Sequence, residues 1–241
     1  MNPQFFTTSG KVLAGALSPA DFTGLIGWWK ADSYTGSDGD LVASWNDSSG
    51  SGKTATQGNG SLKPKFYNNI YNGKPCMRFD GGNDYLTLAS SLTPIAWNKA
   101  WSAIGVGKIA ASKQCAFLGS SDSTDYLTRN SSANRIEIRI LSSGAAKQSN
   151  AFTTGATDLT MFSWTIADGA SGQTAYDAAT SKGSISNYEN VITLARIGND
   201  GSNNFYPWDG DICEICFYRA DMAPNLSNLY TNYFKPKWGL A

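Results

Sequence analysis

Four cysteines and the complete absence of histidine set the first limits on the chemistry of this chain. Cys213 and Cys216 have the Cys-x-x-Cys spacing of half a zinc site or of a redox pair. Such pairs normally lie on a turn or at the start of a helix, whereas these two fall in a run that predicts a strand, with their side chains on opposite faces. We therefore expect both to be buried, small apolar residues. Without histidine, a Ser-His-Asp triad and a histidine metal site are excluded.

Aspartates in loops rich in glycine and serine form a second group with potential chemistry. Carboxylate oxygens are the ligands that Ca²⁺ prefers, but turns of ordinary proteins have the same composition. We interpret these residues as turn formers, keep Ca²⁺ as the alternative, and expect no other cofactor. They are Asp32, Asp38, Asp40, Asp47, Asp80 and Asp84.

Aromatic residues beside amides and charged groups are a third candidate site. Sugars stack on exposed aromatic rings and are oriented by Asn, Asp and Arg side chains. The segment 203–209 fits this pattern best, and Trp208 is its main aromatic candidate, although Trp208 and Tyr206 have the alternative role of capping the core. The candidate ligand-binding residues are Asn203, Tyr206, Trp208, Asp209, Tyr126 and Arg129.

The charge balance limits the class of partner. Lys and Arg together number 19, as do Asp and Glu, so the formal net charge is +0. A nucleic-acid-binding surface needs an excess of basic residues, and we expect no such partner. No apolar run reaches the roughly 18 residues of a membrane-spanning helix. Residues 1–10 lack the pattern of a secretion signal, so we expect the cysteines to be reduced when the protein folds.

The longest apolar stretch organises the rest of the chain. Asp209-Gly210 predicts a tight turn, and the residues after it predict a strand to Tyr218. Alternation places the even-numbered residues of this strand, including Ile212 and Glu214, on one face, and the odd-numbered residues from Cys213 on the other. Because both faces are apolar, we expect the central strand of a sheet that is covered on both sides.

Short strands are predicted along the remainder of the chain. Residues 135–140 alternate most regularly, with three isoleucines on one face and three charged residues on the other. One helix is predicted from Asp221 or Ala223, with one face packed on the sheets and its end at Pro236. The other predicted strands are 25–32, 41–45, 76–80, 85–88, 101–109, 116–119, 161–166, 174–176 and 192–197. This pattern indicates an all-β fold, a two-sheet antiparallel jelly-roll sandwich with one short C-terminal helix.

Residues 1–24 mix apolar residues with Gly, Ser, Thr and Pro and follow neither the helical nor the strand period. We interpret this segment as an N-terminal arm that precedes a single domain at residues 25–241. Such an arm either packs on its own domain or docks on a neighbouring subunit, and we favour the neighbour.

Four stretches in this order resemble the concanavalin A-like lectin/glucanase superfamily, in its laminin G-like jelly-roll branch. They are residues 24–32, residues 45–50 with 54–57, residues 73–81 with 84–86, and residues 210–218 with the late helix and the ending 237–240. Together they span about residues 24–240. The resemblance implies two large antiparallel sheets stacked face to face, one of them concave.

Members of this superfamily that cleave glucans carry Glu-x-Asp-x-x-Glu on one strand, so that a nucleophile and an acid share a face. The nearest strands here contain Glu137 and Glu214, and each lacks a second acidic residue at the required offset. Arg135 and Arg139 flank Glu137 and favour its ionised form. We interpret Glu214 as a buried carboxylate satisfied by backbone donors or an arginine, and we expect no enzymatic activity.

These observations predict a non-enzymatic structural or adhesion protein of a larger assembly. By analogy at the level of the fold, we expect a phage virion decoration, fibre or tail component, made in the host cytoplasm. Its partners would be other structural subunits, bound through the N-terminal arm, and glycans or another surface, bound through the lectin-like domain. A free carbohydrate-binding module, calcium-dependent or not, is the alternative, and a glycoside hydrolase ranks below both.

Overall fold

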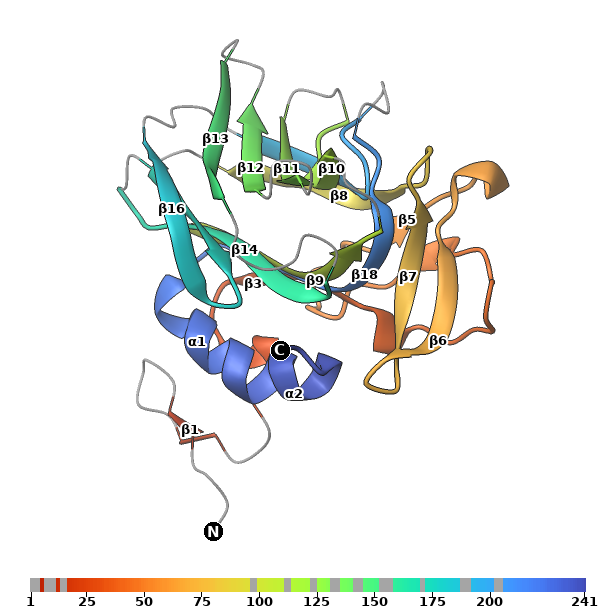
Figure 1. The fold of residues 1–241 in the computed structure, drawn as a ribbon, viewed down its shortest axis with the longest axis horizontal. Helices are drawn as coiled ribbons and strands as arrows, with labels where there is room; N and C mark the ends of the chain where they lie inside the picture. The colour runs from red at the N-terminus through yellow and green to blue at the C-terminus, as the bar shows by residue number, and fades with distance from the viewer. Residues whose placement is uncertain are drawn as a thin grey trace.

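Two antiparallel sheets form a sandwich, and a C-terminal helix covers one outer face (Figure 1). This confirms the predicted fold class. The computed structural model describes residues 5–6, 12–13, 17–95, 99–110, 114–121, 125–130, 135–140, 145–151, 158–169, 172–186, 192–201 and 206–241.

The first sheet, here the β17 sheet, has the strand order β13-β12-β11-β10-β17-β8-β5-β4. Its strands are β4 (Ser44–Trp45), β5 (Ala55–Thr56), β8 (Leu86–Ile95), β10 (Gln114–Gly119), β11 (Asp125–Asn130), β12 (Arg135–Ile140), β13 (Ala145–Ala151) and β17 (Ile192–Ile197).

The second sheet, here the β18 sheet, has the order β16-β15-β14-β9-β18-β7-β6, and β3 also pairs with β18. Its strands are β3 (Leu25–Lys30), β6 (Lys65–Tyr71), β7 (Lys74–Asp80), β9 (Trp101–Ile109), β14 (Thr160–Ile166), β15 (Gly172–Asp177), β16 (Thr180–Ser186) and β18 (Asp209–Tyr218).

Strand β18 is central, as the sequence predicts, because β7, β9 and β3 all pair with it. The predicted turn at Asp209-Gly210 is wrong, since both residues belong to the strand. Gly210 has φ +135°, and an added Cβ would lie 2.2 Å from the Lys108 carbonyl oxygen. Glycine is therefore required here by the close approach of β9 and by its own backbone conformation.

A β-bulge in β18 corrects the predicted assignment of its faces. The register with β9 shifts between Ile212, which is opposite Gly107, and Glu214, which is opposite Val106. Cys213 is the extra residue, so alternation restarts there. Ile212 consequently shares the inner face with Ile215, rather than the face of Glu214.

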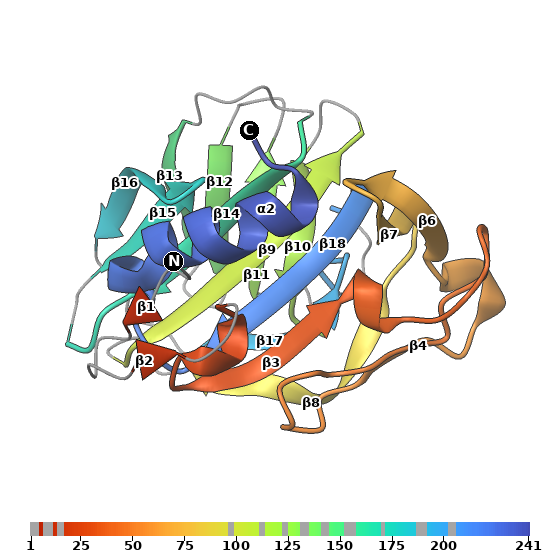
Figure 2. The same cartoon turned by 90° about the horizontal axis from the view of Figure 1, so that it is seen from below.

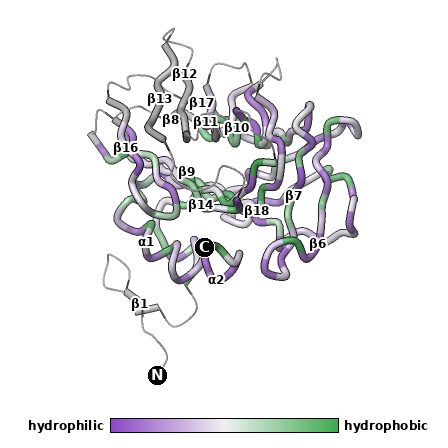
Figure 3. Tube along the Cα trace, viewed as in Figure 1, coloured by the Kyte–Doolittle hydropathy of each residue, from purple (hydrophilic) through white to green (hydrophobic). Residues whose placement is uncertain are grey.

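The space between the sheets is filled with large apolar side chains. Phe117 of the β17 sheet contacts three aromatic rings that reach it from the other sheet and from the segment before β18. These rings are Phe162, Trp164 and Trp208, and all three are at most 1% exposed. The hydropathy of the chain follows this arrangement, with apolar stretches along β9, β14 and β18 (Figure 3).

The C-terminal helix lies across the outer face of the β18 sheet, over β9, β14 and β18 (Figure 2). It comprises a 3₁₀ turn (Ala223–Asn225), α1 (Leu226–Leu229), a π-helical segment (Tyr230–Phe234) and α2 (Lys235–Trp238). Pro236 does not end it, contrary to prediction, because the π segment shifts the hydrogen-bond register just ahead of the proline. Gly239, with φ +68°, ends the helix instead. In the described ranges, no helix has the length and apolar character needed to cross a membrane.

The N-terminal segment divides into two parts. Leu17 and Phe22 are 1% and 6% exposed and belong to the core, and the Tyr218 hydroxyl donates to the Pro19 carbonyl at 2.9 Å. Residues 17–24 of the predicted arm therefore pack on the domain itself. Before them, β1 (Phe5–Phe6) pairs with β2 (Val12–Leu13) in a separate two-stranded sheet.

Candidate functional site

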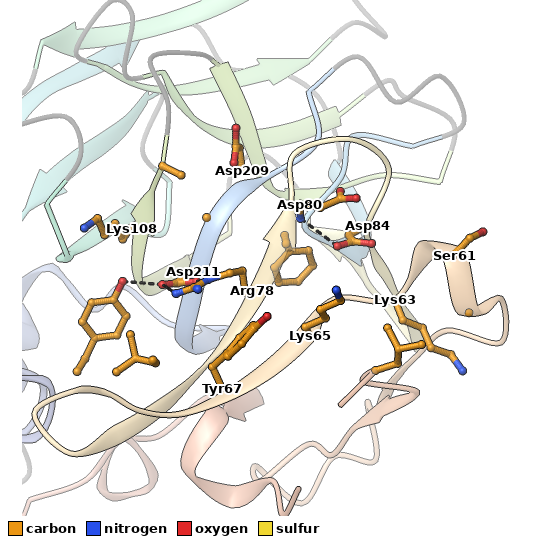
Figure 4. A pocket seen from close by; sticks show the side chains of 17 residues that line it. Ser61, Lys63, Lys65, Tyr67, Arg78, Asp80, Asp84, Lys108, Asp209 and Asp211 are labelled. Atoms are coloured by element: carbon orange, nitrogen blue, oxygen red, sulfur yellow. Dashed lines mark hydrogen bonds and ion pairs between the residues drawn. The ribbon is translucent and has the colours of Figure 1, made fainter. Parts of the chain in front are cut away.

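A pocket of about 880 Å³ lies beside the hairpin of β6 and β7, where these strands meet β18 and the end of β9 (Figure 4). This volume falls within the range of small-molecule sites. The residues that line it include Leu41, Lys63, Lys65, Tyr67, Ile70, Tyr71, Arg78, Asp80, Asp84, Lys108, Asp209 and Asp211.

Strand register explains why these side chains share one face. Lys65 lies opposite Arg78, Arg78 opposite Asp211, and Asp211 opposite Lys108, across β6, β7, β18 and β9. Residues directly opposite in antiparallel strands point to the same face, so these four form one row across three strand spacings, about 14 Å. We call Lys65, Arg78, Asp211 and Lys108 the basic row. It lies on the outer face, because an added Cβ at the neighbouring Gly107 would instead contact buried Trp208.

The centre of the basic row is held by a bidentate ion pair. Arg78 Nε and Nη2 donate to Asp211 Oδ1 and Oδ2 at 2.7 and 2.9 Å, and the Tyr71 hydroxyl donates to Oδ2 at 2.7 Å. The Arg78 guanidinium also lies 4.7 Å from the centre of the Tyr67 ring. Burial and the Asp211 charge raise the pKa of Tyr71 well above its ordinary value, so this phenol stays neutral and donates. These contacts fix the pocket floor.

A second row, one step along the strands, is acidic. Asp80 lies opposite Asp209, two residues from Arg78 and Asp211 in their respective strands, and both line the pocket. Asp80 Oδ1 accepts from the N–H groups of Gly82 and Asn83, at 2.8 and 3.2 Å.

Asp84 adds a third carboxylate at this end of the pocket. Asp84 Oδ2 accepts from the Asp80 N–H at 2.9 Å, and the residue is 5% exposed. Burial raises the pKa of Asp84 to about 6; the Asp80 N–H lowers it, the Asp80 charge raises it further, and Lys65 lowers it. Asp84 therefore exchanges its proton near pH 6.

The rim combines lysines with apolar side chains. Three lysines of the pocket form no ion pair within 4.0 Å with a carboxylate of the described residues: Lys63, Lys65 and Lys108. Leu41 and Ile70 are 47% and 38% exposed, and in the described part of the chain they are the exposed large hydrophobic side chains. Such exposed apolar groups at a pocket mouth are typical of binding sites.

The sequence-predicted ligand-binding residues are largely elsewhere. Asp209 lines the pocket, but Trp208 is 0% exposed and packs on Phe117 and Phe162. The Trp208 ring therefore has no face open to a sugar, and the residue takes the alternative role of packing in the core. Tyr126 is 2% exposed, and its ring centre lies 5.3 Å from that of half-buried Tyr206. Asn203 and the side chain of Arg129 lie outside the described residues.

The predicted turn aspartates accept hydrogen bonds or form ion pairs within the protein. Asp47 accepts from the N–H groups of Trp28, Ser49 and Lys53, at 2.8 to 3.0 Å. Burial would raise the pKa of Asp47, but hydrogen bonds from Lys53 and Ser49 outweigh it and lower the value. Among the residues that the structure describes, no group of three or more Asp, Glu or Cys side chains is arranged to hold a metal.

Glu214 is completely buried, as predicted, but its predicted partners are wrong. It accepts from side chains of β3 and the C-terminal helix instead of from backbone groups or an arginine. The donors are Trp28 Nε1 (2.5 Å), Tyr233 Oη (2.8 Å), Lys237 Nζ (2.9 Å) and Trp238 Nε1 (2.8 Å). Burial also raises the pKa of the Cys213 and Cys216 thiols well above the ordinary value, and neither is in a disulfide. The side chain of Glu137 lies outside the described residues.

Comparison with known proteins places the fold but not the family. No protein-family model and no curated protein matches the sequence. Among solved structures, domain 4 of AbnA, a GH43 extracellular arabinanase from Geobacillus stearothermophilus in complex with arabinotriose, aligns with a TM-score of 0.60 and 15% identity, over 86% of this chain and 98% of that one.

Two further structures share the fold over part of a longer protein. A Trypanosoma rangeli sialidase in complex with sialic acid aligns with a TM-score of 0.56 and 13% identity, over 94% of this chain and 35% of the sialidase. The binding domain of Paraclostridial Mosquitocidal Protein 1 aligns with a TM-score of 0.56 and 10% identity, over 89% of this chain and 53% of that one. At these identities the likeness shows a β-sandwich of this architecture, which is compatible with a lectin-like jelly roll, and the laminin G-like assignment stays a prediction.

The sequence predicts three of the four strands that line the pocket, but it predicts neither β6 nor the cross-strand register that brings the pocket side chains together. Strand β6 was not predicted, although Asn72-Gly73, with φ values of +48° and +73°, forms the type of turn that joins two hairpin strands. Reading that dipeptide as a hairpin would have paired residues 65–71 with 74–80, but a regular hairpin would place Lys65 opposite Asp80. The irregularity between Tyr67 and Tyr71 shifts the register, so that Lys65 lies opposite Arg78 instead.

Proposed function

We propose that this protein is a carbohydrate-binding β-sandwich and that its ligand occupies the pocket beside β6 and β7. The observation that carries the proposal is the pocket's composition. A half-buried aromatic ring, Tyr67, and exposed apolar groups at Leu41 and Ile70 lie beside two rows of charged side chains. Apolar ring faces combined with convergent polar groups are what a saccharide, with its C–H faces and equatorial hydroxyls, requires.

The structural neighbours support the proposal at the level of the fold. One is a domain of an arabinanase, in complex with arabinotriose, which this chain matches over nearly the whole of that domain. Another is described as the binding domain of its protein. Fold likeness does not carry a ligand from one protein to another, so the pocket residues bear the argument.

We further propose that the domain binds without catalysing hydrolysis. A glycosidase needs two carboxyl groups flanking the scissile bond, with one of them protonated at working pH. Asp84 has the raised pKa for an acid, but it is 5% exposed and bonded to the Asp80 N–H. Glu214 has no exposed surface. Incubation with arabinan, galactan and polygalacturonate, followed by a reducing-end assay, should show no release of sugar, and any turnover abolished by D84N would refute this point.

Binding itself is tested with a glycan array, followed by calorimetry on the retained saccharide. Tyr67→Ala should lower the affinity severalfold, because a specific contact with an aromatic ring contributes about 0.5–1.5 kcal/mol. Tyr230→Ala, a half-buried tyrosine on the C-terminal helix away from the pocket, is the matched control and should bind normally. Retention of no saccharide by the folded protein, or equal loss in both variants, would contradict the proposal.

A finer proposal is that the domain is the adhesion module of a larger assembly, such as a phage virion. The observation that favours it is the separate sheet of β1 and β2, which joins neither sheet of the sandwich. In this proposal residues 1–16 bind other structural subunits and the pocket faces the surface to be recognised. Deletion of residues 1–16 should leave the melting temperature and saccharide binding unchanged and abolish incorporation into the assembly. Incorporation of the truncated protein at normal levels would refute this role.

A further inference from the structure

We propose that the pocket selects an acidic saccharide, whose carboxylate or sulfate group lies at the basic row while its hydroxyl groups face the acidic row. This inference rests on the proposed function and specifies the class of ligand. It follows from how the charged groups of the pocket are already paired within the protein.

The basic row has an excess of positive charge. It contains three cations, Lys65, Arg78 and Lys108, and one carboxylate, Asp211. Asp211 is bound at both oxygens by Arg78 and at one by Tyr71, so it is occupied. The two lysines lie in different outer strands of the row, with Lys108 at the end of the pocket away from Lys63 (Figure 4). Anionic groups of a ligand above the row would receive charge-assisted hydrogen bonds from these ammonium groups, which form no ion pair within 4.0 Å with a carboxylate of the part of the chain that the structure describes.

The acidic row suits the hydroxyl groups of the same ligand. An ionised carboxylate has about four acceptor sites, and the hydrogen bonds from Gly82 and Asn83 use only Asp80 Oδ1. Asp80 therefore keeps acceptor capacity for sugar hydroxyls. A neutral sugar would supply no counter-charge to the lysines of the basic row, whereas a strong polyanion without hydroxyls would be repelled by Asp80 and Asp209. The adjacent rows thus favour a ligand that carries both kinds of group.

The pH dependence of binding follows from the same geometry. Asp84 faces Asp80, Lys65 and Lys63 at one end of the pocket (Figure 4). Because its pKa is raised to about 6, lowering the pH from 7.5 to 5 removes one negative charge from the pocket. The affinity for an acidic saccharide should therefore rise severalfold when the pH is lowered from 7.5 to 5. The affinity for a neutral saccharide should not show this rise.

The experiment is calorimetry of the full chain with three trisaccharides of equal length: galactotriose, trigalacturonate and a sulfated galactotriose. We expect trigalacturonate, the sulfated sugar or both to bind at least tenfold more tightly than galactotriose. Lys65→Gln and Lys108→Gln should each weaken that binding about tenfold, the loss typical of one charge-assisted hydrogen bond. Lys99→Gln removes an equal charge at an exposed site outside the pocket and should have no effect.

The outcomes separate this inference from the proposed function. If galactotriose binds as well as the acidic sugars and Tyr67→Ala weakens both, the carbohydrate site stands and the acidic preference is overturned. If Lys99→Gln weakens acidic binding as much as Lys65→Gln, the interaction is non-specific attraction and the inference is again overturned. If the folded protein binds none of these or any arrayed saccharide, the proposed function itself fails.

Discussion

Replacement of Glu214 by glutamine tests whether one buried carboxylate anchors the C-terminal helix to the β18 sheet. Four side-chain donors converge on its two oxygens: Trp28 from β3, and Tyr233, Lys237 and Trp238 from the helix. Burial and the Glu214 charge raise the pKa of Tyr233 well above its ordinary value, so its hydroxyl is neutral and donates. The substitution keeps the shape of the side chain but turns one oxygen into a donor.

The expected cost follows from these contacts. The new amide group faces two of the four donors, so at least one buried N–H or O–H loses its acceptor, at about 1–3 kcal/mol. Lys237, whose side chain is 12% exposed, loses its fully buried counter-charge and retains Asp32 Oδ1 at 3.1 Å. Disrupting a buried pair in this way costs about 3–5 kcal/mol, which corresponds to a fall in Tm of roughly 6–20 °C for a domain of this size.

The assay is urea unfolding followed by tryptophan fluorescence, because Trp28 and Trp238 both contact the mutated group. Asp32→Asn is the matched control: it removes a carboxylate from the same lysine, but its side chain is 22% exposed, and it should cost less than about 1 kcal/mol. The double variant E214Q/K237M should be more stable than the sum of the single effects predicts, since the second change removes the unpaired charge. A free energy of unfolding for E214Q within 1 kcal/mol of the wild type would refute the reasoning.

Three further predictions concern single features of the fold. Gly210→Ala should lower the free energy of unfolding by more than about 3 kcal/mol or prevent folding, because the added Cβ would lie 2.2 Å from the Lys108 carbonyl oxygen; circular dichroism of the melting transition measures this, and a shift of a degree or two would contradict it. Asp84→Asn should stabilise the protein by about 2 kcal/mol above pH 6 and give no gain below pH 4. The sign follows because the native state holds the Asp84 proton more tightly than the unfolded chain does. The stability of the wild type therefore falls as the pH rises from 4 to 6 and stays level above pH 6. Equal gains in stability at pH 4 and pH 7 would exclude this cause. The Cys213 and Cys216 thiols should resist a thiol reagent such as DTNB in the native protein and react only on unfolding, since both are buried and their pKa values are raised.

The sequence predicts the architecture well where periodicity and burial agree. Strands 101–109, 135–140 and 192–197 have their predicted bounds, and the strand after Gly210 is central because both of its faces are apolar. The errors arise where tertiary contacts override local preference. The dipeptide Asp209-Gly210 predicts a turn when it is considered alone. In the structure both residues lie in β18, and glycine is needed there because β9 approaches the backbone closely. A proline usually ends a helix, but here a π-helical segment precedes Pro236 and the helix continues through it.

The candidate site was less predictable than the fold, since its residues lie far apart in the sequence. Aromatic residues near Trp208 were the natural candidates, yet the largest rings of an aromatic-rich chain are also its best core residues, and Trp208 is fully buried. The pocket instead depends on cross-strand register. Lys65 and Lys108 belong to one row only when β6, β7, β18 and β9 pair in this order, which no local pattern encodes.

The bulge at Cys213 connects the pocket to the helix anchor. Asp211 and Glu214 are three residues apart, so a regular strand would direct them to opposite faces. Opposite Asp211 lies Lys108, and opposite Glu214 lies Val106, two residues away on the same face of β9. One extra residue therefore places both carboxylates on the outer face, where Asp211 supports the pocket and Glu214 binds the helix. Because the bulge positions both groups, the ligand site and the docking of the helix share one structural cause, and a change that removes the bulge must disturb at least one of them.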